Sequence, residues 1–81
     1  MKRIIIALAA VLLSAYTDSD VARKSLAGAG YTDIEITGYA FFGCSEDDEF
    51  HTGFKAKGLN GAPVEGVVCS GWLKGATIRL D

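Results

Sequence analysis

The sequence contains two cysteines and a single histidine, which are the residue types most often used for covalent and metal chemistry. An even number of cysteines in an exported chain predicts a disulfide, and here Cys44 can pair only with Cys69. The alternative is that both thiols join His51 in a zinc site, but such a site normally needs four clustered ligands. We therefore expect a Cys44–Cys69 disulfide, with no metal and no other cofactor.

Four consecutive carboxylates begin two residues after the first cysteine, at Glu46, Asp47, Asp48 and Glu49. A calcium loop spaces its oxygen ligands so that they wrap around the ion, often with a glycine at the tight turn, and this run lacks that spacing. A solvated acidic loop is the simplest interpretation. Contact with a cation or with a basic partner protein is the alternative.

His51 is the obvious candidate for acid–base catalysis, but catalysis would require a nucleophile or a carboxylate arranged beside it. No Ser-His-Asp or Cys-His arrangement can be argued, because both cysteines are expected to be bonded to each other. We interpret His51 as a surface histidine, and the sequence predicts a protein that is not an enzyme.

Three aromatic residues, Tyr39, Phe41 and Trp72, are candidates for a binding surface. If they converge, they form an exposed aromatic patch of the kind that anchors protein–protein interfaces. The alternative is structural: the same rings would cover the rear of a thin sheet or pack on the disulfide.

The N-terminal residues have the order of a bacterial export signal. Lys2 and Arg3 precede an apolar run over residues 4–13, and the small residues Ser14 and Ala15 follow. The run is shorter than the roughly 20 apolar residues that cross a bilayer. We expect a signal peptide over residues 1–15 and a single small domain over residues 16–81; a retained N-terminal anchor is the alternative.

The segment Leu13-Ser14-Ala15 resembles the first three positions of a lipoprotein signal, which ends in a lipidated cysteine. Tyr16 stands at the place of that cysteine, so this chain cannot carry the lipid there. Either Tyr16 replaces a lipidated cysteine, or the signal is an ordinary one that is cut after Ala15. Signal, size and one cysteine pair together resemble small envelope proteins, among them phage superinfection-exclusion lipoproteins. That resemblance implies a protein that blocks a receptor or an injection step.

The charge balance restricts the class of partner. Without Lys2 and Arg3, six of the eight basic residues remain against ten acidic ones, a net charge of −4. A negative chain is a poor ligand for nucleic acid, whose affinity comes largely from Lys and Arg, and for anionic lipid. We expect a location in the periplasm or at the outer membrane, with membrane association only if Tyr16 replaces a lipidated cysteine.

Hydrophobic periodicity predicts an α+β fold. Ala22 and Leu26 lie at helical spacing, Thr17, Asp18 or Ser19 is placed to cap the helix before them, and Gly30 is placed to end it in a left-handed conformation. Alternating apolar residues follow. The expected elements are a helix over residues 20–29 and strands over residues 31–42, 50–58, 64–70 and 76–80. The simplest topology is an antiparallel meander with the helix on one face; a small half-barrel is the alternative. The expected core is Leu26, Ile34, Ile36, Phe54, Val68, Ile78 and Leu80.

The favoured hypothesis is therefore a non-enzymatic, exported envelope protein that binds another protein, and its more specific form is a phage-encoded protein that acts in superinfection exclusion. Its contact residues would be Tyr39, Phe41, Trp72 and the acidic residues 46–49. The alternative is an inhibitor of a periplasmic or cell-wall enzyme such as a lysozyme, in which the acidic loop docks on a cationic active site. A small hydrolase is disfavoured for lack of a nucleophile–base pair.

Overall fold

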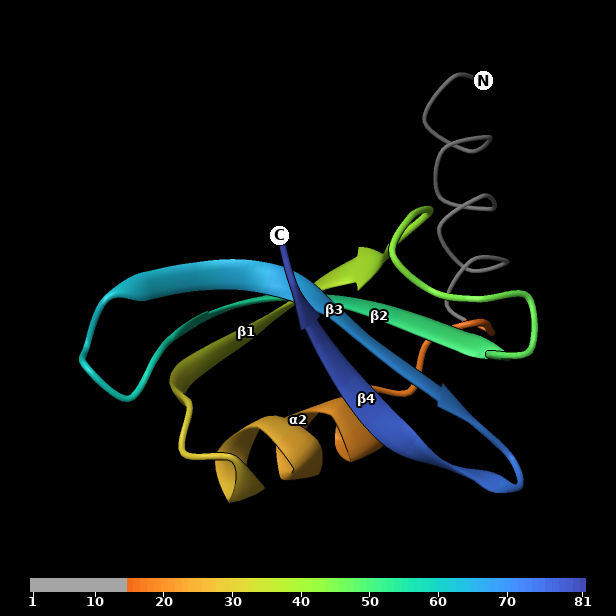
Figure 1. The fold of residues 1–81 in the computed structure, drawn as a ribbon, viewed down its shortest axis with the longest axis horizontal. Coiled ribbons are helices and arrows are strands. Elements are labelled where there is room, and N and C mark those ends of the chain that lie inside the picture. Colours follow the sequence, from red (N-terminus) through yellow and green to blue (C-terminus); the bar gives the residue numbers. More distant parts are fainter. Residues whose placement is uncertain (1–14) are drawn as a thin grey trace, which may run out of the picture.

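Residues 15–81, the part of the chain that the computed structural model describes, fold into one helix followed by a four-stranded antiparallel sheet (Figure 1). The strand order β1-β2-β3-β4 is that of a meander, with β1 and β4 at the two edges. The predicted α+β fold, an antiparallel meander with the helix packed on one face, is confirmed. Nearly all of the predicted signal peptide lies outside the described residues. The elements are α2 (Ser19–Gly28), β1 (Thr32–Tyr39), β2 (Phe50–Lys57), β3 (Pro63–Gly71) and β4 (Lys74–Leu80).

The helix α2 begins where the sequence predicted a cap. The Asp18 carboxylate accepts a hydrogen bond from the backbone N–H of Val21 at 3.1 Å, which satisfies one of the free amides of the first turn. The backbone N–H of Asp18 in turn donates to the buried hydroxyl of Thr52 in β2 at 2.9 Å. The start of the helix is therefore attached directly to the sheet.

The end of α2 also follows the expectation from sequence. Gly30 adopts a left-handed conformation with φ of 94°, and the N–H of Tyr31 returns to the carbonyl of Leu26 at 3.0 Å. Glycine is favoured here because a Cβ disfavours this backbone region. The chain can then reverse direction and enter β1, which packs against the helix.

The core lies between α2 and one face of the sheet (Figure 1). Leu26 of the helix, Phe54 of β2 and Val68 of β3 are fully or almost fully buried, and Ile36 and Ile78 pack against them. The core also contains Ala22 and Ala56, which the sequence-based set omitted. One member of that set is wrong: Leu80 is 50% exposed, because it lies at the end of the edge strand β4.

Strand β1 is shorter than predicted and ends at Tyr39. Gly38 has a φ of 111°, and the pairing with β2 shifts between Ile36 and Gly38. This irregularity is a β-bulge, which breaks the two-residue alternation of side chains. Phe41 and Phe42, expected at the end of this strand, instead lie in the loop over residues 40–49.

That loop crosses the sheet face opposite the helix. Val68 points into the core, so its neighbours Val67 and Cys69 point to the other face. Cys44 of the loop is bonded to Cys69, and Gly43 lies so close to Val67 that a Cβ on Gly43 would collide with the Val67 side chain. The loop is thus attached to the middle of the sheet.

Candidate functional site

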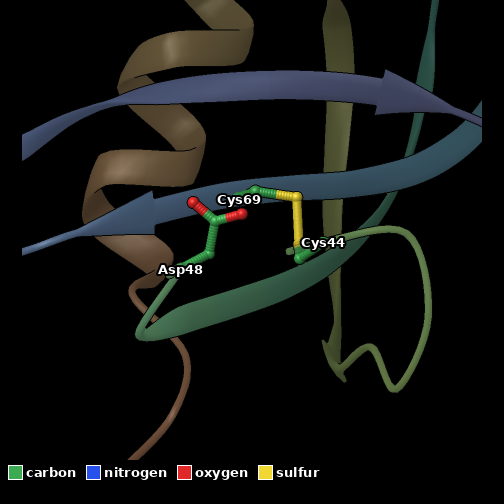
Figure 2. A group of neighbouring side chains, drawn as sticks. All are labelled: Cys44, Asp48 and Cys69. Atoms are coloured by element: carbon green, nitrogen blue, oxygen red, sulfur yellow. A yellow bond between two sulfur atoms is a disulfide. The ribbon is translucent and has the colours of Figure 1, made fainter. Parts of the chain in front are cut away.

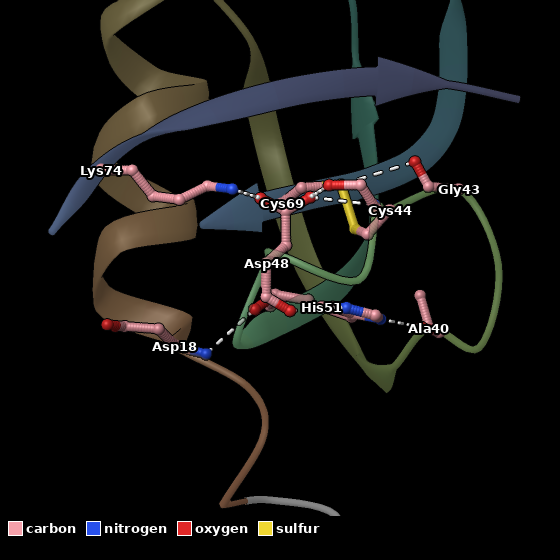
Figure 3. Close-up of a disulfide and its surroundings, with 10 residues drawn as sticks. Asp18, Ala40, Gly43, Cys44, Asp48, His51, Cys69 and Lys74 are labelled. Atoms are coloured by element: carbon pink, nitrogen blue, oxygen red, sulfur yellow. Dashed lines mark hydrogen bonds and ion pairs between the residues drawn. A yellow bond between two sulfur atoms is a disulfide. The ribbon is translucent and has the colours of Figure 1, made fainter. Parts of the chain in front are cut away.

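The loop over residues 40–49 is held by a disulfide. The two sulfurs of Cys44 and Cys69 are bonded, with the Cα atoms 5.6 Å apart, and Cys69 is almost completely buried in β3 (Figure 3). This confirms the predicted pairing. The carboxylate of Asp48 lies beside the two sulfurs of this disulfide (Figure 2). Since the sulfurs are bonded to each other, neither is a thiolate that could ligate a metal ion.

Asp48 organises the acidic turn from within. Its carboxylate accepts hydrogen bonds from the backbone N–H and the hydroxyl of Ser45, both at 3.0 Å, and pairs with the Lys74 ammonium at 2.7 Å. Only 8% of the Asp48 side chain is exposed. The bond from Lys74, assisted by those from Ser45, lowers the pKa of Asp48 to about 2. The same carboxylate raises the pKa of Lys74.

His51 closes the loop at its base. One ring nitrogen lies 3.2 Å from the carbonyl oxygen of Ala40 and the other lies 2.9 Å from that of Asp48, near the two ends of the loop (Figure 3). The backbone N–H of His51 donates to the carbonyl of Tyr16 at 2.8 Å. Sequence reasoning assigned His51 to the open surface, but the structure gives it partners on two sides of the loop and on the N-terminal segment.

Tyr39 is the centre of an aromatic cluster. Its ring stacks on the His51 ring with the centroids 5.2 Å apart and an interplanar angle of 11°. The rings of Phe41 and Tyr16 contact Tyr39 edge to face, with centroids at 5.0 Å and 6.2 Å. Trp72 makes a separate edge-to-face pair with the buried Phe50 at 5.0 Å.

A hollow of about 470 Å³ joins the two aromatic groups to the acidic turn. Its lining residues are Ala15, Tyr16, Tyr39, Glu46, Asp48, Glu49, Phe50, His51 and Trp72. The structure thereby brings together Tyr39, Trp72 and three of the four acidic residues singled out from sequence. Phe41 and Asp47 do not line it, although Phe41 packs against Tyr39.

Sequence reasoning missed four lining residues, Ala15, Tyr16, Phe50 and His51. Phe50 and His51 begin β2, and the turn between β3 and β4 carries Trp72 to the same end of the sheet. A signal was present in the expected hairpin order, which places the start of β2 beside the end of β3. Tyr16 carried no such signal, because the return of the N-terminal segment to His51 is a tertiary contact.

The chain is similar to a phage protein. It is 59% identical over 60 residues to the uncharacterized 7.2 kDa protein in the Gp39-comCA intergenic region of Enterobacteria phage T4, an alignment that covers 73% of this chain and 92% of the relative. The chain belongs to the family of this phage protein. This similarity confirms the prediction of a phage protein. It does not test the predicted role in superinfection exclusion. No family model and no solved structure matches the chain.

The name of the phage relative gives a size and a genomic position, so a function of this chain has to be inferred from the geometry of the hollow. Among residues 15–81 there is no helix of the length and apolar character needed to cross a bilayer. The export signal, the lipoprotein resemblance and the contact residues remain predictions from sequence.

Replacing Asp48 with asparagine is expected to lower the free energy of unfolding by about 1 kcal/mol at pH 7, a value discounted because the Lys74 partner is exposed to solvent. Asp48 has a lowered folded-state pKa of about 2 against a usual 3.8, so its contribution is complete above pH about 4. It is lost as the pH falls from about 4 to about 2. Chemical denaturation across this range measures the effect.

The matched control is Asp47→Asn, which removes a neighbouring exposed carboxylate that accepts no hydrogen bond from Ser45. The Asp48→Asn protein should show a flatter dependence of stability on pH than the parent protein, and Asp47→Asn should not. Equal pH dependence in all three proteins would show that the contacts of Asp48 do not stabilise the fold.

Proposed function

We propose that this chain is an exported, non-enzymatic phage protein that binds another protein of the host envelope through the hollow. The observation that carries this proposal is the convergence of Tyr39, Trp72 and the acidic turn on one concave surface. These residues come from β1, from the turn between β3 and β4 and from the loop before β2. A surface assembled from three separate segments depends on the tertiary fold, as a specific binding site does.

The exposure of Trp72 supports protein binding. Its side chain is 77% exposed, although tryptophan is among the costliest residues to leave in water, and its ring rests on the buried Phe50. Trp and Tyr are enriched among residues that dominate binding energies, particularly where packing holds them in place beforehand. Trp72 is therefore both exposed and held in place before a partner binds, which are the properties of an interface anchor.

The disulfide that attaches the loop over residues 40–49 to β3 supports action outside the cytoplasm. A disulfide is stable in an oxidising compartment, and the N-terminal sequence has the order of an export signal. In such a compartment the Cys44–Cys69 bond would hold the acidic side of the hollow in position. Within that location, membership of a phage family favours superinfection exclusion, in which the bound protein is a receptor or an injection channel.

A second candidate, an inhibitor of a cell-wall enzyme such as a lysozyme, is favoured by the acidic turn. Glu46, Asp47 and Glu49 are exposed, and within the described residues none of them lies at ion-pair distance from a cation. Asp48 holds the turn through Ser45 and Lys74, so the exposed carboxylates stand on a braced segment. Both candidates use the same surface and differ in the partner.

The test is a photo-crosslinking amino acid placed at position 72 of the full chain, expressed in the bacterial host. We expect a discrete crosslinked species in the envelope fraction, which mass spectrometry then identifies. The matched control is the same amino acid at Leu59, another exposed side chain, in the turn between β2 and β3 at the opposite end of the sheet. A receptor or channel as the crosslinked protein would select exclusion, and a lysozyme would select inhibition.

Intact mass measured on the same fraction checks export. The expected mass corresponds to cleavage after Ala15 and to the loss of two hydrogens in the disulfide. Crosslinking of equal yield at positions 72 and 59, or recovery of the full-length chain with free thiols from the cytosol, would contradict the proposal.

A further inference from the structure

Within residues 15–81, two carboxylates on the acidic side of the hollow are in no ion pair, although Glu49 lies near Lys74, which is itself paired with Asp48. Asp48 is committed to Lys74 and Ser45, but Glu46 and Glu49 make no ion pair among residues 15–81. The carboxylate of Glu49 lies directly against Gly71, in the space that a Cβ at position 71 would occupy. Glu49 therefore lies close to Trp72, the residue that follows Gly71, and both side chains line the hollow.

The aromatic side of the hollow presents ring faces of the kind that attract cations. One face of Tyr39 is covered by the stacked His51 ring, but Trp72 and Tyr16 are exposed. Phe50 contacts Trp72 edge to face, and the Trp72 side chain is still 77% exposed, so the indole ring stays accessible from the hollow. The face of an indole carries negative charge density and is the most favourable aromatic surface for a cation.

We propose that the hollow binds an arginine side chain of the partner protein, with the guanidinium over the Trp72 ring and paired with Glu46 and Glu49. This rests on the function proposed above and names the group that the site recognises. Arginine fits better than lysine because its planar guanidinium stacks on an aromatic ring and donates several hydrogen bonds to carboxylates at once. The hollow of about 470 Å³ has room for one such side chain together with part of its backbone.

The test titrates the protein that begins at Tyr16, the form expected after cleavage, with three capped tripeptides, Gly-Arg-Gly, Gly-Lys-Gly and Gly-citrulline-Gly. Trp72 is the single tryptophan, so its fluorescence and its indole N–H resonance report directly on the hollow. We expect saturable changes with the arginine peptide, at least about threefold weaker binding of the lysine peptide and no saturation with citrulline, which keeps the shape but lacks the charge. Binding should weaken between 50 mM and 500 mM salt.

Variants identify the contacts. Glu46→Gln/Glu49→Gln should weaken binding of the arginine peptide about tenfold, and Trp72→Leu about fivefold by calorimetry. The control is Glu35→Gln, an exposed carboxylate in β1 that does not line the hollow, and its affinity should equal that of the parent. Unchanged circular dichroism in each variant shows that the fold is retained.

Equal binding of the arginine and citrulline peptides, or equal loss in the Glu35 variant, would overturn the inference. Binding of the lysine peptide as tight as that of arginine would overturn the assignment to a guanidinium. A partner that crosslinks at position 72 while the arginine peptide does not bind would reject this inference and leave the proposed function standing. Binding of the arginine peptide without a specific crosslink at position 72 would reject the proposed function and leave this inference standing.

Discussion

Replacing both cysteines with alanine is expected to lower the free energy of unfolding by about 3–4 kcal/mol. Cys44 and Cys69 are separated by 25 positions, and closing a loop of this length removes much conformational freedom from the unfolded chain. Small domains are stable by only about 5–15 kcal/mol in total, so the loss is a large fraction. Chemical denaturation of the double variant beside the oxidised parent protein measures it.

The reduced parent protein is the control, because it lacks the bond but keeps both side chains. The free energy of unfolding of the reduced protein should match that of the double variant, apart from the small effect of removing two sulfur atoms. The loop also carries Glu46 and Glu49, so reduction should weaken binding at the hollow while the helix and sheet remain. If the reduced and oxidised proteins were equally stable, the contacts of Asp48 and His51 would have to hold the loop without the bond.

The parts of the fold that were predictable are those with regular local patterns. Ala22 and Leu26 at helical spacing, with Asp18 before them and Gly30 after them, give both ends of α2. In β2 the alternation of buried Phe54 and Ala56 with exposed Lys55 and Lys57 gives the orientation of the strand. Each of these signals comes from residues close in sequence, where the backbone geometry is fixed by hydrogen-bonding rules.

The predictions are wrong at two places: where the alternation of side chains in β1 is interrupted, and where Leu80 is exposed at the edge of the sheet. The prediction continued the alternation of β1 through Gly38 to residue 42, but the bulge at Gly38 resets the register and the strand ends at Tyr39. Leu80 has the parity of a core residue, yet among residues 15–81 no further strand pairs with the outer edge of β4. Neither result follows from a hydrophobic pattern, because both depend on neighbouring strands.

Half of the candidate site could be found from residue chemistry. Tyr39, Trp72 and the acidic run were chosen because exposed aromatic and charged residues are suited to binding, and the structure places them around one hollow. Tyr16 and His51 were missed as members of it. Their proximity depends on the hydrogen bond between the two backbones and on the ring contacts with Tyr39, which link positions far apart in the sequence.

Replacing Phe54 with alanine is expected to lower the free energy of unfolding by about 3–5 kcal/mol, the range found for removal of a buried aromatic ring. Phe54 is the largest fully buried side chain, lies in the core against α2 and contacts the Tyr31 ring edge to face at 6.3 Å. Its removal leaves a cavity between the helix and the sheet that the surrounding backbone cannot fill. Thermal and chemical denaturation measure the loss.

Phe42→Ala is the matched control, because the same ring is removed from a side chain that is 89% exposed. We expect a change of no more than about 0.5 kcal/mol there, since little apolar surface returns to water. If Phe54→Ala is too unstable to purify, Phe54→Leu serves instead with an expected loss of about 1–2 kcal/mol, because leucine refills part of the cavity. Equal effects at positions 54 and 42 would mean that the helix does not dock on this face of the sheet. The hollow would then lose its support too, since the N–H of Asp18 at the start of α2 is bonded to Thr52, the residue after His51.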